Sequence, residues 1–158
     1  MLRYLNLDTP DDLVFLYELV CQRYNGKYVI SVHNDCKEPP TYRQHVEWVF
    51  DWVDAVEANK ENLYLIAEHI EVSEDGDSWS EKKGALTFNA DSNEIGIFVH
   101  NDYYKQGIGT KIFNEFLEAW GPSNEPITAN INIDNKPSQK FFEKIGFNKV
   151  GHIYKFNN

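Results

Sequence analysis

Apolar positions in the first half of the chain follow two periodicities. Residues spaced by three or four, as on one face of a helix, follow Thr9-Pro10 and again Thr41, and they predict helices over 10–25 and 41–58. Short apolar segments bounded by polar residues predict strands, at 2–7, 62–70 and 84–89. Segment 71–83 is acidic, carries serines and has no periodicity, so we expect an exposed hairpin loop there, long for its type.

The most informative stretch runs from Glu94 to Trp120. It predicts a buried strand over 94–100, a turn over 101–109 and an amphipathic helix that starts near Ile108. Gly107 and Gly109 at the helix start let backbone N–H groups approach a ligand closely, and the unpaired donors of a first turn suit a phosphate. A tight strand-to-helix connection without any ligand fits the same glycines.

Towards the C-terminus, apolar and polar residues alternate over 127–133, which predicts a strand. Asn135 and Pro137 then start a helix that ends at Gly146, and a final strand is expected over 147–156. The predicted order is β-α-α-β-β-β-α-β-α-β. We expect one domain spanning residues 1–158.

Composition narrows the class of protein. Of 158 residues, 42% are hydrophobic and 15% aromatic, which is typical of a globular chain. The net charge of −10 argues against a nucleic-acid surface and favours a cationic partner, although solubility alone also accounts for it. There is no apolar run of membrane-spanning length. Two cysteines make neither a disulfide framework nor a zinc site, so we expect a cytoplasmic protein without a metal.

Two segments together resemble the GCN5-related N-acetyltransferase (GNAT) family. Its acetyl-CoA motif appears as Val99-His100-Asn101-Asp102-Tyr103-Tyr104-Lys105-Gln106-Gly107-Ile108-Gly109, and its later motif as Asn135 to Phe147, in the expected order and spacing. The resemblance implies an α/β (α+β) fold: a mixed, mostly antiparallel central sheet flanked by helices and splayed at the strand that binds acetyl-CoA. It covers about the last 75 residues directly.

The resemblance implies acetyl-CoA as the acetyl donor. Backbone groups of the strand would polarise the acetyl carbonyl, the turn would hold the pyrophosphate, and Asn135 would contact the CoA arm, cap the next helix, or do both. The residues expected at the cofactor are Phe98, Val99, Tyr104, Lys105, Gln106, Gly107, Ile108, Gly109, Thr110, Asn135, Ser138 and Phe142.

Three positions depart from the family pattern. Tyr104 replaces the usual Arg or Gln, and Lys105 replaces a common glycine, which makes a positive φ there less expected. Phe142 replaces the tyrosine that often protonates the departing thiolate, and a phenyl ring has no proton to give. Tyr103, Tyr104 or Tyr154 could take that role.

For the general base, the preferred residue is Glu94, which opens the cofactor strand where relatives often place an acid. His100 is the second candidate by pKa and Glu68 the third, and a solvated or structural role is open for each.

The expected function is acetyl transfer to a primary amine of a small molecule, such as an amino sugar, aminoglycoside or polyamine. Two alternatives stay open: transfer to a protein α-amine or lysine, and a non-catalytic acyl-CoA-binding module. We expect neither nucleic acid nor a membrane as a partner, and a homodimer is left open.

Overall fold

The computed structural model describes residues 1–25, 38–58, 62–120 and 126–151. Four strands form one antiparallel sheet in the order β1-β2-β3-β4, with bounds Leu2–Tyr4, Leu63–Val72, Ser78–Asn89 and Glu94–Val99. The helices are α1 (Pro10–Asn25), α2 (Tyr42–Ala58), α3 (Ile108–Trp120) and α4 (Lys136–Lys144), and a short 3-10 turn, η1, spans Asn101–Tyr103.

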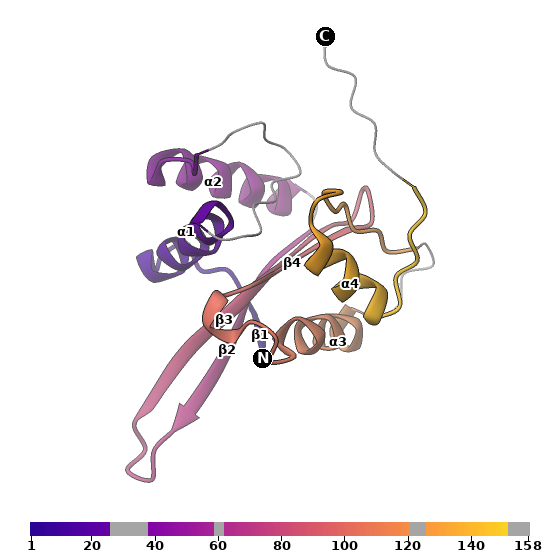
Figure 1. Ribbon diagram of the computed structural model, residues 1–158. Coiled ribbons are helices and arrows are strands. Elements are labelled where there is room, and N and C mark those ends of the chain that lie inside the picture. Colours follow the sequence, from indigo (N-terminus) through magenta and orange to yellow (C-terminus); the bar gives the residue numbers. More distant parts are fainter. Residues whose placement is uncertain (26–37, 59–61, 121–125, 152–158) are drawn as a thin grey trace.

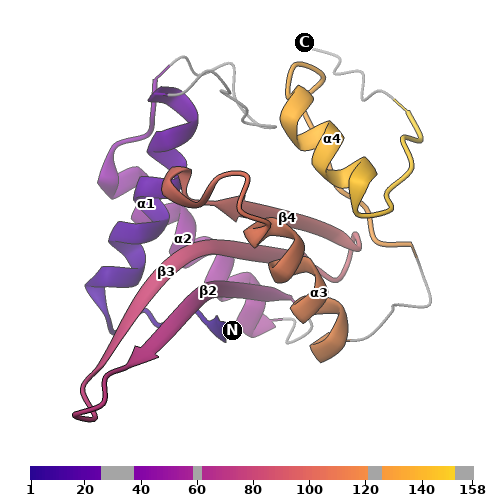
Figure 2. The same cartoon turned by 60° about the horizontal axis from the view of Figure 1, so that its bottom comes forward.

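The helices cover the two faces of the sheet (Figures 1 and 2). α1 and α2 pack on one face, where Ile66 and Ala85 join their buried side chains and Phe98 packs against them. α3 and α4 pack on the other face, where Leu65, Leu86 and Ile97 belong to the larger core. The register explains this division. Ile66 pairs with Ala85 and Ala85 with Phe98, so this row points to α1 and α2, while the adjacent row points to α3 and α4.

The segment predicted as an exposed hairpin loop, 71–83, is an exposed hairpin, but most of it is strand, so the predicted extent of the loop was wrong. β2 and β3 continue to the pair Val72↔Ser78, and a turn closed by the bond from the Ser73 N–H to the Asp77 carbonyl (2.7 Å) joins them. Figures 1 and 2 show this hairpin arm, residues 69–81, projecting beyond the helices. Because it has no core face, its side chains are largely exposed, and the alternation that marks a half-buried strand is missing.

Two further strand predictions were wrong within the described residues. Segment 127–133 is not a strand; it joins the sheet through one parallel bridge between Glu94 and Thr128. Residues 147–151 have no regular structure, and the rest of the expected last strand, 152–156, lies outside the described residues. In the parts of the chain that the structure describes, no helix is both long and apolar enough to cross a membrane.

Candidate functional site

The outer edge of β4 is open along most of its length. Ile95 donates its N–H to the Thr128 carbonyl (2.8 Å), and Thr128 donates to the Asn93 carbonyl (2.7 Å). Between residues 94–99 and 126–135, all of which are described, no further backbone bond is made. The two segments therefore diverge beyond Thr128, as the sequence resemblance implies for a splayed strand.

The alternation of backbone groups along β4 identifies which N–H and C=O groups face this opening. Ile95 points its N–H away from β3, whereas His100 donates its N–H to the Lys83 carbonyl on the β3 side (2.9 Å). Since backbone groups alternate along a strand, the N–H and C=O of Ile97 and Val99 face the open edge, and those of Phe98 face β3. Sequence reasoning singled out Phe98 and missed Ile97; counting alternate residues from the strand's buried positions would have found it.

The turn after β4 presents a second set of donors. It contains two left-handed residues, Lys105 (φ 63°) and Gly107 (φ 79°), so the expectation that lysine disfavours a positive φ at 105 was wrong. Lys111 donates its N–H to the Gly107 carbonyl (3.1 Å), which starts the bonding pattern of α3. No backbone carbonyl of the described residues accepts a bond from the N–H groups of 107–110. These donors mark the positive end of the α3 dipole.

The side chains of Gln22 from α1, His100 and Gln106 brace the turn. The Asn101 N–H donates to Gln22 Oε1 (2.6 Å), and Gln106 Nε2 donates to the Asp102 carbonyl (2.8 Å). His100 Nδ1 accepts the Asp102 N–H (3.3 Å), and its ring stacks on Phe15 of α1, with centroids 6.1 Å apart. His100, predicted as a candidate base, thus caps η1. The side chain of Gln106 is bonded to the backbone of η1.

The second motif packs α4 against the start of α3. A Cβ on Gly109 would lie 3.0 Å from two ring carbons of Phe141 and 3.6 Å from Val99 Cγ2, which explains a glycine there. Asn135 Oδ1 accepts the Ser138 N–H (3.0 Å), so its expected capping role is confirmed. Phe142 is 7% exposed, and its ring lies edge-on to that of Phe147, with centroids 5.0 Å apart.

The candidate acids and bases are dispersed. Glu94 is half-buried at the start of β4 and, by strand alternation, shares a face with Gly96, Phe98 and His100. A hydrogen bond to Glu81 raises the pKa of the Tyr103 hydroxyl to about 12. Tyr104 is 42% exposed beside the turn. Tyr154 lies outside the described residues.

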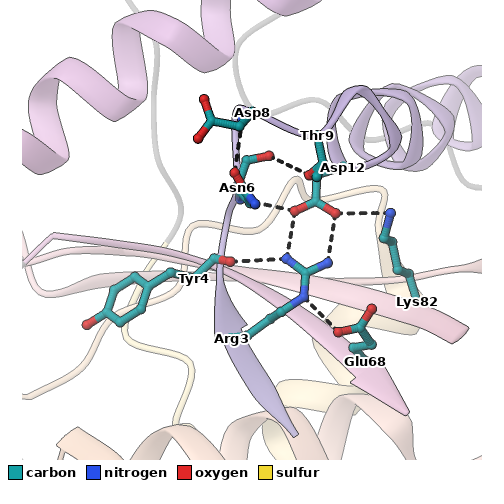
Figure 3. Close-up of polar contacts among 8 residues, drawn as sticks. All are labelled: Arg3, Tyr4, Asn6, Asp8, Thr9, Asp12, Glu68 and Lys82. Carbon is teal, nitrogen blue, oxygen red and sulfur yellow. Dashed lines mark hydrogen bonds and ion pairs between the residues drawn. The ribbon is translucent and has the colours of Figure 1, made fainter. Parts of the chain in front are cut away.

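Glu68, the third candidate base, belongs to an ion cluster that joins β1, α1, β2 and β3 (Figure 3). Arg3 contacts Asp12 through two bonds of 2.6 and 2.8 Å and Glu68 through one of 2.7 Å, and Lys82 lies 3.0 Å from Asp12. The hydrogen bond from Arg3 lowers the pKa of Glu68. A carboxylate held in this way is a poor proton acceptor.

Two hollows in the described surface lie away from the open edge. One, of about 90 Å³, lies between α3 and the base of the hairpin arm, and the other is bordered by Met1, Leu2 and the last turn of α3. Both adjoin the side of α3 that carries Glu115, whereas Gly109 faces Phe141. We therefore place the candidate site by the free backbone groups of β4 and of the turn.

Comparison with known proteins agrees with this geometry. Residues 2–148 match the family described as an acetyltransferase (GNAT) domain. The crystal structure of an N-acetyltransferase from Staphylococcus aureus Mu50 superposes with a TM-score of 0.63 at 17% sequence identity, covering 96% of this chain and 84% of that one. A transcriptional regulator from Bacillus halodurans C-125 superposes with a TM-score of 0.59 at 16% identity, covering 100% and 99% of the two chains. At such identities the structural likeness is one of fold.

Proposed function

Because the chain belongs to the GNAT acetyltransferase family, we propose that it binds acetyl-CoA along the open edge of β4 and transfers the acetyl group to a primary amine of a small molecule. The observation that carries this proposal is the alignment of two donor sets. The free N–H groups of Ile97 and Val99 lead along the strand towards the free N–H groups of 107–110.

These N–H groups suit the chemistry of acetyl-CoA. An amide-bearing arm can pair with the edge of a strand as an added strand would, and a pyrophosphate suits the first turn of a helix. Lys105 and Lys111 add positive charge near that turn in a chain whose net charge is −10. Ser138 and Asn135 would border the arm from the start of α4, and Tyr104 from the turn.

Acetyl transfer needs a polarised carbonyl, a neutral amine and a proton for the departing thiolate. An N–H on the open edge of β4 would polarise the carbonyl. Glu94 would take the amine proton, directly or through water, or hold the ammonium before transfer. Since Phe142 has no proton to donate, Tyr103, Tyr104, Tyr154 or solvent would supply it. A thiolate leaves readily, so the reaction does not depend on a strong acid.

The test combines binding with turnover. We expect calorimetry to show acetyl-CoA binding and a thiol-release assay to detect turnover with some member of a panel of small amines. Absence of acetyl-CoA binding would refute the proposal. Binding without thiol release from any small amine, or from peptides offered in parallel, would instead support the alternative of a non-catalytic acyl-CoA-binding module.

The role of Glu94 is tested separately. Glu94→Gln is expected to lower kcat about 100-fold at neutral pH while leaving acetyl-CoA affinity unchanged. Glu118→Gln, which alters an exposed carboxylate near the far end of α3, is the matched control and should retain full activity. Unchanged turnover and acceptor affinity in Glu94→Gln would remove Glu94 from the mechanism.

A further inference from the structure

Five residues on the α1–α2 face of the sheet form what we call the Arg23 cluster: Arg23 from α1, His45 and Trp52 from α2, Tyr64 from β2 and Phe98 from β4. The Arg23 guanidinium carbon lies 4.1 Å from the centroid of the Phe98 ring. The rings of Trp52 and Tyr64 meet edge-on at 6.5 Å. Tyr64 and Phe98 pack against the same core cluster, and the charge of Arg23 acts on both Tyr64 and His45.

Polar atoms of this cluster lack partners. His45 is 1% exposed, and both of its ring nitrogens, together with Trp52 Nε1, are buried without a hydrogen-bond partner. None of the ion pairs among the described residues gives Arg23 a carboxylate. Buried polar groups without partners are rare in proteins, and they call for a ligand or water that completes them.

The polar groups of this cluster are mainly donors. An arginine and a tryptophan nitrogen can only donate hydrogen bonds. Burial, helped by the charge of Arg23, lowers the pKa of His45 to about 4, so its ring is neutral near pH 7 and has one N–H to give. The guanidinium carbon lies over the Phe98 ring, and a guanidinium in contact with a ring still has N–H groups that can donate to a carboxylate or a phosphate. An oxygen anion is therefore the ligand that suits the donors of this set.

We propose that the Arg23 cluster binds an anionic group of the acceptor, so that the acceptor is an amine that also carries a carboxylate or a phosphate. This inference rests on the proposed function and names its substrate class. Phe98 is four residues from Glu94 on the same face of β4, about 13 Å between Cα atoms at the rise of a strand. The amine would lie near Glu94 and the anion near Arg23. Opposite charges on one acceptor also cancel, so the net charge of −10 does not repel it.

The test uses matched amines that differ in the anion. With CoA saturating the protein, calorimetry compares γ-aminobutyrate with butylamine and phosphoethanolamine with ethanolamine. We expect the anionic member of at least one pair to bind about 10- to 100-fold more tightly, the range of hydrogen bonds to a charged group. A preference in the first pair indicates a carboxylate as the anion, and a preference in the second pair indicates a phosphate. Arg23→Met should abolish the preference and leave the affinity for the plain amine unchanged.

Arg43→Met is the matched control, because Arg43 lies on α2 with an 88% exposed side chain paired to Glu47. It should keep the preference for the anion. If thermal melting shows that Arg23→Met does not fold, Trp52→Phe, which removes one N–H and keeps an aromatic ring, should weaken binding of the anionic amine severalfold. The inference is overturned if both members of each pair bind equally well. It is also overturned if the preference for the anionic amine persists in Arg23→Met or, where that variant does not fold, in Trp52→Phe.

The thiol-release assay separates this inference from the proposed function. Binding that depends on the anion and on Arg23, without thiol release from any acceptor, would refute acetyl transfer and leave the anion site standing. Thiol release from plain amines as fast as from anionic ones would support transfer and overturn the anion site.

Discussion

Gly84 illustrates how closely β3 approaches β4. A Cβ at this position would lie 2.3 Å from the Phe98 carbonyl oxygen, and it could be accommodated only if the backbone of β4 moved. We expect Gly84→Ala to lower the free energy of unfolding by about 2–4 kcal/mol, as overpacking against backbone does. Urea unfolding measures the change, with Gly151→Ala, whose Cβ would meet nothing within 4 Å, as the control. A loss under about 0.5 kcal/mol would contradict this close approach.

Phe142 stands where the family pattern has a proton-donating tyrosine, but its ring is a core side chain here. It is 7% exposed and contacts the rings of Phe141 and Phe147. A hydroxyl added to this ring would be desolvated, so we expect Phe142→Tyr to cost about 1 kcal/mol of stability without raising kcat. Denaturant unfolding and steady-state kinetics test both parts. A large rise in kcat would mean that position 142 can act as the acid and that the natural chain lacks one.

The ion cluster around Asp12 holds three elements together. Asp12 is 1% exposed at the start of α1 and contacts Arg3 of β1 and Lys82 of β3. Burial would raise the pKa of Asp12, but hydrogen bonds from Arg3, from the Asn6 N–H and from Lys82 outweigh it and lower the pKa to about 2. Since the unfolded carboxyl titrates near pH 4, its contribution to stability is present above about pH 4 and is lost as pH falls to about 2.

Asp12→Asn should therefore lose less stability on acidification than the natural chain. We expect the difference in unfolding free energy between the two proteins to shrink by about 2 kcal/mol from about pH 5 to about pH 2. Urea unfolding across that range measures it. Asp11→Asn, which changes the exposed neighbour on the same turn of α1, should follow the natural chain. A constant difference for Asp12→Asn would show that the carboxyl is not stabilised by its partners.

At the level of elements, prediction from the sequence succeeded where side chains are buried. α1, α2, α3 and α4 and the strands β2 and β4 were predicted close to their positions because each buries an apolar stripe or row. The outer half of the hairpin arm was missed because it is stabilised by backbone pairing, as at Glu71↔Trp79, and not by a core. The strand expected over 127–133 was overpredicted, because alternating isoleucines show burial on one side without fixing a pairing partner.

The outer half of the hairpin arm lies away from the candidate site. Ile70, Val72 and Trp79 on it are 46%, 67% and 54% exposed, and its outer half projects away from the helices (Figure 2). Replacing residues 70–80 by Asn-Gly, a short hairpin turn, is expected to leave acetyl-CoA affinity within about twofold. Calorimetry on the shortened chain tests this. A tenfold loss would show that the arm takes part in binding.

At the same scale, the candidate site was only partly predictable. The turn at Gly107 and Gly109 and the motif from Asn135 were found from local patterns, which resemble the family closely. Arg23 was not found, because its proposed role depends on a contact with Phe98, 75 positions later in the chain. Nor does periodicity reveal that His45 and Trp52 keep unpartnered nitrogens, since both lie on the expected apolar stripe of α2. Such features come from tertiary packing.

The open edge of β4 also bears on how the protein behaves at high concentration. A row of unpaired N–H and C=O groups at Ile97 and Val99 is a template on which an extended segment of any chain, including another copy, can add as a strand. A molecule lying along that edge would block this association as well as serve the reaction. Bound acetyl-CoA would therefore shield this edge from strand addition. In the protein without acetyl-CoA, the repulsion among chains of net charge −10 would oppose the same association.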